Sequence, residues 1–256
     1  KIYASNGLFD NGKQLLEDAK KAYSLGFRVY KMRVIDPDTI SDLVKSFNKK
    51  FKNRMQLIVD AVQGSSANPW ATKVSINLAK KLEREEIVFL EEPCRVENIK
   101  GYKDIKKFST LNIAGAESIP TARAFKKYLD EDVFDILQFD IATSGFIEGR
   151  RICDLAYIHN KPVAIHSWGS AISIMAGIHL GLTVPNVAFT EYCFMDHPIN
   201  KELFENKKIK IINGFTPKPN SHGLGVHFKD ILSKKFQYKE KINTMISTNN
   251  DDIKLK

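Results

Sequence analysis

Hydrophobic positions along the chain fall into short apolar runs separated by longer amphipathic stretches. The short runs have the length and composition of buried strands, and the stretches between them repeat apolar residues at helical spacing. The pattern predicts eight strands joined by seven helices. The predicted strands are 1–5, 27–34, 55–60, 87–91, 112–116, 134–140, 162–166 and 187–191, and the predicted helices are 11–25, 37–51, 69–82, 99–108, 121–129, 148–159 and 170–182.

Regular alternation of strands and helices indicates parallel strands with helical crossovers. Eight such strands close naturally into a barrel. We therefore predict an α/β fold, a modified TIM barrel of the (β/α)7β type, over residues 1–228. Beyond residue 191 the pattern breaks: 207–212 predicts one further strand, 217–226 is rich in turn residues, and 229–256 forms a charged C-terminal tail.

The composition is that of an ordinary globular protein, with 256 residues of which 43% are hydrophobic and 27% are charged. No apolar run reaches the length needed to cross a bilayer, and the first residues do not resemble a signal peptide. We expect a cytoplasmic protein with no membrane partner. Its three cysteines lack CxxC or Cys/His spacing, which argues against a disulfide framework and a structural zinc.

The net charge of +9 raises the question of nucleic-acid binding. The lysines are spread over the predicted helix faces, and no basic block carries interleaved aromatic residues. A solvated outer face explains this distribution, so we expect no nucleic-acid partner. A positive background would instead favour the approach of an anionic small molecule.

Three consecutive predicted strands end on acidic residues. The run 87–90 stops at Glu91, which is followed by Glu92 and Pro93, and the neighbouring runs stop at Asp60 and Glu117. Side chains alternate along a strand, so the two adjacent glutamates should point in opposite directions. Proline then ends the strand. In a parallel barrel these strand ends meet at one face, so the three acids should converge there.

The other strands deliver further polar residues to the same face, namely Lys31, Arg33, Asp140, His166 and Glu191. Each of these residues has a purely structural interpretation. The two cations could be surface charges, Asp140 could cap a helix, and His166 could be a hydrogen-bonded structural histidine. Their occurrence together on successive strand ends favours a catalytic site instead.

Carboxylates that converge on one point raise one another's pKa values unless a cation lies between them. Hard oxygen ligands without cysteine or histidine favour Mg²⁺, or Mn²⁺ as a substitute, over zinc. Such an ion can bind a substrate carboxylate and stabilise the enediolate that forms when the neighbouring α-proton is removed. His166 is a base of suitable pKa for that step, and Asp140 could orient it.

The same residues resemble the barrel domain of the enolase superfamily, specifically the mandelate racemase subgroup. The resemblance runs from Lys1 to about Val226. The residues that carry it are Lys31-Met32-Arg33, Asp60, Glu91-Glu92-Pro93, Gly115-Ala116-Glu117, Asp140, His166, Glu191 and the closing Gly223-Leu224-Gly225-Val226.

The resemblance implies a role for each of these positions. Asp60, Glu91 and Glu117 would be the ligands of one Mg²⁺, His166 and Asp140 a general-base dyad, and Glu191 a hydrogen-bonding electrophile to the substrate carboxylate. It also implies that Lys31 and Arg33 act in catalysis and substrate binding, that the protein forms homo-oligomers, and that an N-terminal α+β capping domain lies outside this chain. The aromatic residues Trp168, Tyr192 and Phe194 either take part in substrate choice or serve only in packing.

Two departures from the family pattern refine the expected activity. Arg33 stands where family members usually carry a second lysine as the opposite-face base, and its guanidinium stays protonated. A common asparagine contact is lost, because the chain reads Asp60-Ala61-Val62. One-base chemistry is typical of the acid-sugar dehydratases in this subgroup.

The leading hypothesis is therefore a Mg²⁺-dependent dehydratase that converts an aldonic or aldaric acid into a 2-keto-3-deoxy acid. A racemase or epimerase of a 2-hydroxy acid is the nearest alternative. A lactonising cycloisomerase is less favoured, because that subgroup relies on lysines rather than a His/Asp pair. A non-catalytic metal-binding barrel is a further alternative.

Overall fold

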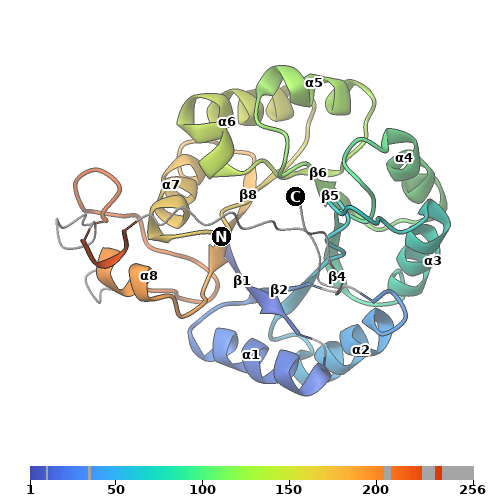
Figure 1. Ribbon diagram of the computed structural model, residues 1–256, viewed down its shortest axis with the longest axis horizontal. Helices are drawn as coiled ribbons and strands as arrows, with labels where there is room; N and C mark the ends of the chain where they lie inside the picture. The colour runs from blue at the N-terminus through green and yellow to red at the C-terminus, as the bar shows by residue number, and fades with distance from the viewer. Residues whose placement is uncertain (10, 34–35, 205–208, 227–233, 238–256) are drawn as a thin grey trace, which may run out of the picture.

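The computed structural model describes residues 1–9, 11–33, 36–204, 209–226 and 234–237. Eight parallel strands form a closed barrel in chain order, β1 to β8, and helices α1 to α7 lie in the connections and surround it (Figure 1). The predicted fold is confirmed. The strands are β1 (Ile2–Leu8), β2 (Val29–Arg33), β3 (Gln56–Asp60), β4 (Ile87–Glu91), β5 (Ile113–Gly115), β6 (Ile136–Leu137), β7 (Val163–Ile165) and β8 (Val187–Cys193).

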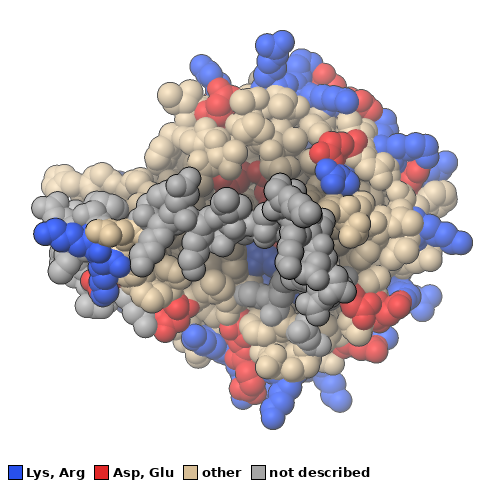
Figure 2. Space-filling view, in the orientation of Figure 1, with Lys and Arg blue, Asp and Glu red and all other residues tan. Residues whose placement is uncertain are grey.

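The connecting helices close to the predicted bounds are α1 (Gly12–Ser24), α2 (Ile40–Phe51), α3 (Thr72–Leu82), α4 (Ile99–Phe108), α5 (Ala122–Asp130) and α7 (Ala171–Gly181). Their apolar faces pack against the outside of the strands in one large buried cluster. Their lysines point outward, and Figure 2 shows Lys and Arg side chains around the rim of the molecule, interspersed with acidic ones. The solvated lysine-rich face is therefore a property of the helical ring.

A separate apolar cluster fills the inside of the barrel, and each strand contributes one side chain to it. These residues are Tyr3, Val29, Ile58, Phe89, Ala114, Ile136, Ala164 and Phe189. Because side chains alternate along a strand, the residue two positions later on each strand faces the same interior. On seven strands that residue is polar and buried, which creates a polar layer directly above the apolar one: Ser5, Lys31, Asp60, Glu91, Gln138, His166 and Glu191.

The sixth strand and the helix after it differ from the prediction. Strand β6 spans only Ile136–Leu137, and Asp140 pairs with His166 through an isolated bridge instead of extending the strand. Helix α6 (Ile141–Ile158) begins seven residues before its predicted start, because Asp140 caps it. The backbone at Gly145 has a φ of +68°, which interrupts the helix and separates its first turn from the rest.

Past Glu191 the structure shows an element that the sequence did not predict, the short helix α8 (Pro198–Leu203), which lies beside α7 outside the barrel (Figure 1). The predicted strand at 207–212 falls partly outside the described residues, and its described end at Ile212 pairs only with Phe215 in a turn. The predicted tail at 229–256 lies outside the described residues except for 234–237.

The three cysteines are free and buried, as expected. In the described part of the chain, no helix is both long enough and apolar enough to cross a bilayer.

Candidate active site

Lys31 lies at the centre of the polar layer and is almost completely buried. Its Nζ is 2.8 Å from Glu91 Oε1, 3.0 Å from Glu191 Oε1 and 3.5 Å from Asp60 Oδ2. Burial alone would lower the pKa of Lys31, but the charges of Glu191 and Glu91 outweigh it and hold the pKa well above its ordinary value. Lys31 is therefore a permanent cation shared by carboxylates from three strands.

Arg33 follows Lys31 by two residues on β2 and faces the same interior, as the alternation of side chains predicted. Its Nε is 3.4 Å from Asp60 Oδ2, and its Nη1 donates to the backbone carbonyl of Asn6. Its guanidinium carbon lies 3.6 Å from the centre of the Trp168 ring, which covers it in a cation–π contact. Trp168 thus holds Arg33 against one wall of the barrel mouth.

His166 and Asp140 form a close pair at the ends of β7 and β6. His166 Nδ1 is 2.7 Å from Asp140 Oδ2, while its Nε2 lies 3.1 Å from Glu117 Oε2 and 3.4 Å from Glu191 Oε2. Burial by itself would lower the pKa of His166. The charges of Glu191 and Glu117 and the hydrogen bond with Asp140 outweigh it and raise the pKa to about 9.

Asp140 both caps a helix and contacts His166, the two roles that the sequence suggested for it. Its second oxygen, Oδ1, accepts a hydrogen bond from the backbone N–H of Thr143 at 2.7 Å and so caps helix α6. The structural role and the contact with His166 use different oxygens, so neither excludes the other.

Glu191 is fully buried between the two groups of residues. Its Oε2 accepts a hydrogen bond from the Ser167 backbone N–H at 3.0 Å. Burial raises the pKa of Glu191, but Lys31, His166 and Arg33 outweigh that effect and lower it. In this arrangement Glu191 is a hydrogen-bond acceptor, and the electrophilic role implied for it requires that it gain a proton when substrate binds.

The predicted metal ligands Asp60, Glu91 and Glu117 all reach the barrel mouth. Glu117 does so because Ala116 has a φ of +86°, which ends the regular strand and lets the next side chain reach His166. Among the described residues, no three acidic, histidine or cysteine side chains form a ready-made metal cluster. Lys31 and His166 instead contact these carboxylates.

The chemistry of the donor set nevertheless fits a hard divalent cation. Glu91 Oε2 is buried without a hydrogen-bond partner in the described structure, and burial together with Asp60 raises the pKa of Glu91 to about 7. The mouth contains more acidic than cationic groups. The carboxylates are Asp60, Glu91, Glu92, Glu117, Asp140 and Glu191, and the cationic groups are Lys31, Arg33 and His166.

All nine sequence-predicted site residues therefore lie around one opening. Two further buried polar residues were not predicted there. Glu92 is 4% exposed, and Gln138 is completely buried with neither side-chain amide atom hydrogen-bonded to a described residue. Side chains two residues apart in an extended segment point to the same side, so Gln138 faces the interior if Asp140 does. The sequence alone could therefore have predicted the position of Gln138.

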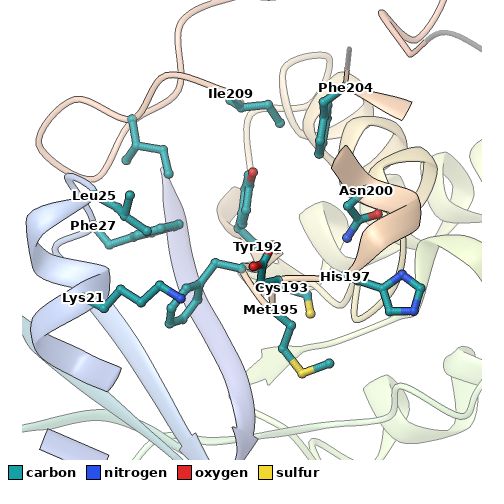
Figure 3. A pocket seen from close by; sticks show the side chains of 13 residues that line it. Lys21, Leu25, Phe27, Tyr192, Cys193, Met195, His197, Asn200, Phe204 and Ile209 are labelled. Carbon is teal, nitrogen blue, oxygen red and sulfur yellow. The ribbon is translucent and has the colours of Figure 1, made fainter. Parts of the chain in front are cut away.

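A separate cavity of about 410 Å³ lies outside the barrel between α1 and α8, and none of the nine predicted site residues lines it (Figure 3). Leu25 and Phe27 enter it from one side, and Asn200 and Phe204 from the other. Tyr192 lines this cavity and packs edge-on against Phe27 with ring centres 5.5 Å apart. Phe194 also packs on Phe27. Both aromatic residues therefore serve in packing here.

Comparison with known proteins identifies relatives over most of the chain. Residues 14–231 match the protein-family model described as enolase C-terminal domain-like. The chain is 26% identical over 205 residues to the D-galactonate dehydratase family member RspA of Pantoea ananatis, which covers 78% of this chain and 48% of that protein. It is 23% identical over 245 residues to the arabinonate dehydratase of Saccharolobus solfataricus, covering 93% of this chain and 64% of that protein.

A solved structure shows the same fold. The 3,6-anhydro-D-galactonate cycloisomerase from Zobellia galactanivorans superposes with a TM-score of 0.81 and 30% sequence identity, over 93% of this chain and 66% of that one. The chain thus spans about half the length of the RspA relative and about two thirds of the cycloisomerase.

Proposed function

This chain belongs to the enolase C-terminal domain-like family, and from that premise we propose that it forms the barrel of a Mg²⁺-dependent sugar-acid dehydratase. The substrate would be an aldonic or aldaric acid and the product a 2-keto-3-deoxy acid. The dehydratases among its relatives support this reaction class. The observation that carries the proposal is the pair of His166 and Asp140 beside a group of carboxylates.

His166 is placed to act as the base. Asp140 holds Nδ1 at 2.7 Å, so Nδ1 carries the proton that this hydrogen bond needs and Nε2 presents its lone pair to the mouth when the ring is neutral. Nε2 would take the α-proton of the substrate. The imidazolium that forms is stabilised by Asp140 and Glu191, and it can return a proton to the β-hydroxyl as that group leaves as water.

Asp60, Glu91 and Glu117 would hold the Mg²⁺ ion. When bound, the ion would neutralise the negative charge that develops on the substrate carboxylate as the α-proton leaves. Lys31 would keep Glu91 and Asp60 in their places, since its Nζ lies within 3.5 Å of a carboxylate oxygen of each. Arg33, at the end of β2, would bind the substrate.

The test is a product assay on the complete gene product. Aldonic and aldaric acids are incubated with Mg²⁺, and the products are resolved by mass. A dehydratase gives a keto acid 18 Da lighter than its substrate, and His166→Asn should reduce the rate at least about 10²-fold. His159→Asn is the matched control, because His159 lies at the far end of α6. No loss of water from any acid, or an unchanged rate in His166→Asn, would contradict the proposal.

The similarity to a cycloisomerase at 30% identity supports a second candidate, an isomerase that acts on an anhydro sugar acid. The same product assay distinguishes the two candidates, because an isomerisation leaves the mass of the substrate unchanged whereas a dehydration lowers it. A product of equal mass from an anhydro acid, without any lighter product from the open-chain acids, would decide for the isomerase.

A further inference from the structure

A cavity of about 1020 Å³ lies at the end of the barrel where the strands begin. Its lining includes Arg28 directly before β2, Gln56 at the start of β3 and Ile87 at the start of β4. The candidate active site is built at the C-terminal ends of the same strands. Because parallel strands all begin at one face of a barrel and end at the other, this cavity is separate from the active site.

Cationic side chains surround this cavity, and each of the three connections that lead into β2, β3 and β4 supplies at least one of them. They are Arg28 before β2, Lys49, Lys52 and Arg54 between the last turn of α2 and the start of β3, and Arg84 before β4. Two acidic residues, Glu85 and Glu86, also line the cavity. Charges of one sign on a concave surface reinforce one another's field, so the cavity should attract anions.

The protein itself holds two of these cations in place. Arg28 Nη1 donates to the carbonyl of Phe27 at 2.7 Å, and its guanidinium carbon lies 4.5 Å from the centre of the Tyr23 ring. Arg54 Nη2 donates to the carbonyl of Lys50. Neither guanidinium pairs with a carboxylate of the described chain. A carbonyl acceptor carries no net charge, so both residues keep their positive charge beside the cavity.

The other three cations, Lys49, Lys52 and Arg84, are exposed, and their side chains have no hydrogen-bond or ion-pair partner among the described residues. Glu85 does not serve as a partner, because it accepts a hydrogen bond from Asn48 Nδ2 at 3.3 Å instead. Three exposed cations on the outer helices differ, since each pairs with an acid one turn along: Lys100 with Asp104, Lys126 with Asp130 and Arg150 with Asp154. The cavity therefore presents three unpaired positive charges from two different connections.

We propose that this cavity binds a small ligand that carries several phosphate groups. Arginine binds phosphate through paired N–H donors and lysine binds it as a point charge. The excess of cations over acids favours a ligand with more negative charge than the one or two carboxylates of a sugar acid. The volume is that of a site for a whole small molecule rather than for a single phosphate ion. The inference does not depend on the proposed function.

The experiment is a calorimetric titration of the complete gene product with inorganic tripolyphosphate at physiological salt. Divalent metals are left out, because the probe chelates them. The triple variant Lys49→Gln, Lys52→Gln and Arg84→Gln should bind the probe about 3- to 100-fold more weakly, the range that three exposed ion pairs span. Glu86→Gln removes an acid that repels the probe, and it should tighten binding by about 1.5- to 5-fold.

The matched control is the triple variant Lys100→Gln, Lys126→Gln and Arg150→Gln, which changes the net charge equally, and its affinity should stay within about twofold of the parent's. Equal weakening in both triple variants would show that total charge attracts the probe and would overturn the inference. It is also wrong if the parent binds no tripolyphosphate, or binds citrate as tightly. Displacement of the probe by a DNA oligonucleotide at a lower phosphate concentration would assign the cavity to nucleic acid instead of a small ligand. None of these results bears on the proposed function, whose residues lie at the other end of the barrel.

Discussion

Asp140 makes two separate contacts, and two substitutions can separate their effects. Its Oδ1 accepts from the Thr143 N–H and caps α6, and its Oδ2 contacts His166 Nδ1, each at 2.7 Å. Asparagine keeps the oxygen that caps the helix but loses the charge beside His166. Alanine loses both contacts. We expect Asp140→Asn and Asp140→Ala to share a defect in activity and to differ in stability.

The expected difference in stability follows from the cap. Asparagine caps a helix about as well as aspartate, whereas alanine costs about 1 kcal/mol. Both variants lose the charge next to His166, so that loss largely cancels when the two are compared. For a domain of about this size, 1 kcal/mol corresponds to about 2–4 °C in Tm. Asp140→Ala should therefore melt about 2–4 °C below Asp140→Asn.

The expected loss of activity follows from the tautomer. With the asparagine oxygen occupied by the helix cap, its NH₂ group faces His166 Nδ1 and donates to it. Nδ1 must then accept, and the ring proton moves to Nε2, the nitrogen that should take the α-proton. The equivalent change in serine-protease triads lowers kcat about 10⁴-fold, and we expect a loss of this order for Asp140→Asn.

The assay combines thermal melting by circular dichroism with measurement of kcat and of solvent-deuterium exchange at the α-carbon. Activity of Asp140→Asn within about 10-fold of the parent would refute the role of Asp140 in orienting His166. Equal Tm values for the two variants would refute the capping argument.

Four other changes test the rest of the arrangement. Trp168→Ala uncovers Arg33 and removes a cation–π contact worth about 0.5–2 kcal/mol, so KM should rise by about 2- to 30-fold with a smaller change in kcat in steady-state kinetics. Treatment with EDTA should abolish activity until Mg²⁺ is restored, and Glu117→Gln should stay inactive at any Mg²⁺ concentration while its circular dichroism spectrum is unchanged. Gly149→Ala places a methyl group 2.7 Å from the Phe139 ring, and this overpacking should cost about 1–3 kcal/mol in a denaturant titration without changing KM.

The sequence predicted the order of the barrel strands and the polar residues at their ends, because both depend on local patterns. The period of two fixes which side chains face the interior once a strand is recognised, and it placed Lys31 and Arg33 on one face, as observed. Local patterns were weaker at β6, where the apolar run up to Phe139 reads as a strand. There the regular strand ends at Leu137, although Asp140 still pairs with His166 through a single bridge, and Asp140 then caps the helix.

What could not be predicted depends on contacts between distant segments. The burial of Glu92 depends on Gly64 and Gly115, each more than twenty residues away, and neither glycine signals by itself that a carboxylate fills the space beside it. In the same way, Lys31 is recognisable as a barrel residue, but its simultaneous contact with acids on three other strands appears only when the barrel closes.

Arg33 shows how such contacts limit the chemistry. A racemase needs a base on each face of the α-carbon, and a guanidinium loses its proton only at very high pH. Burial lowers the pKa of Arg33, but Asp60 and Glu191 outweigh it and raise the pKa further, so the structure opposes the deprotonation that a second base would need. Trp168 and the Asn6 carbonyl also hold the group against the wall. Proton transfer should therefore occur on the His166 face alone. In D₂O, a substrate and its α-epimer should not both exchange their α-proton at comparable rates, and comparable exchange from both would show that a base other than His166 acts in this site.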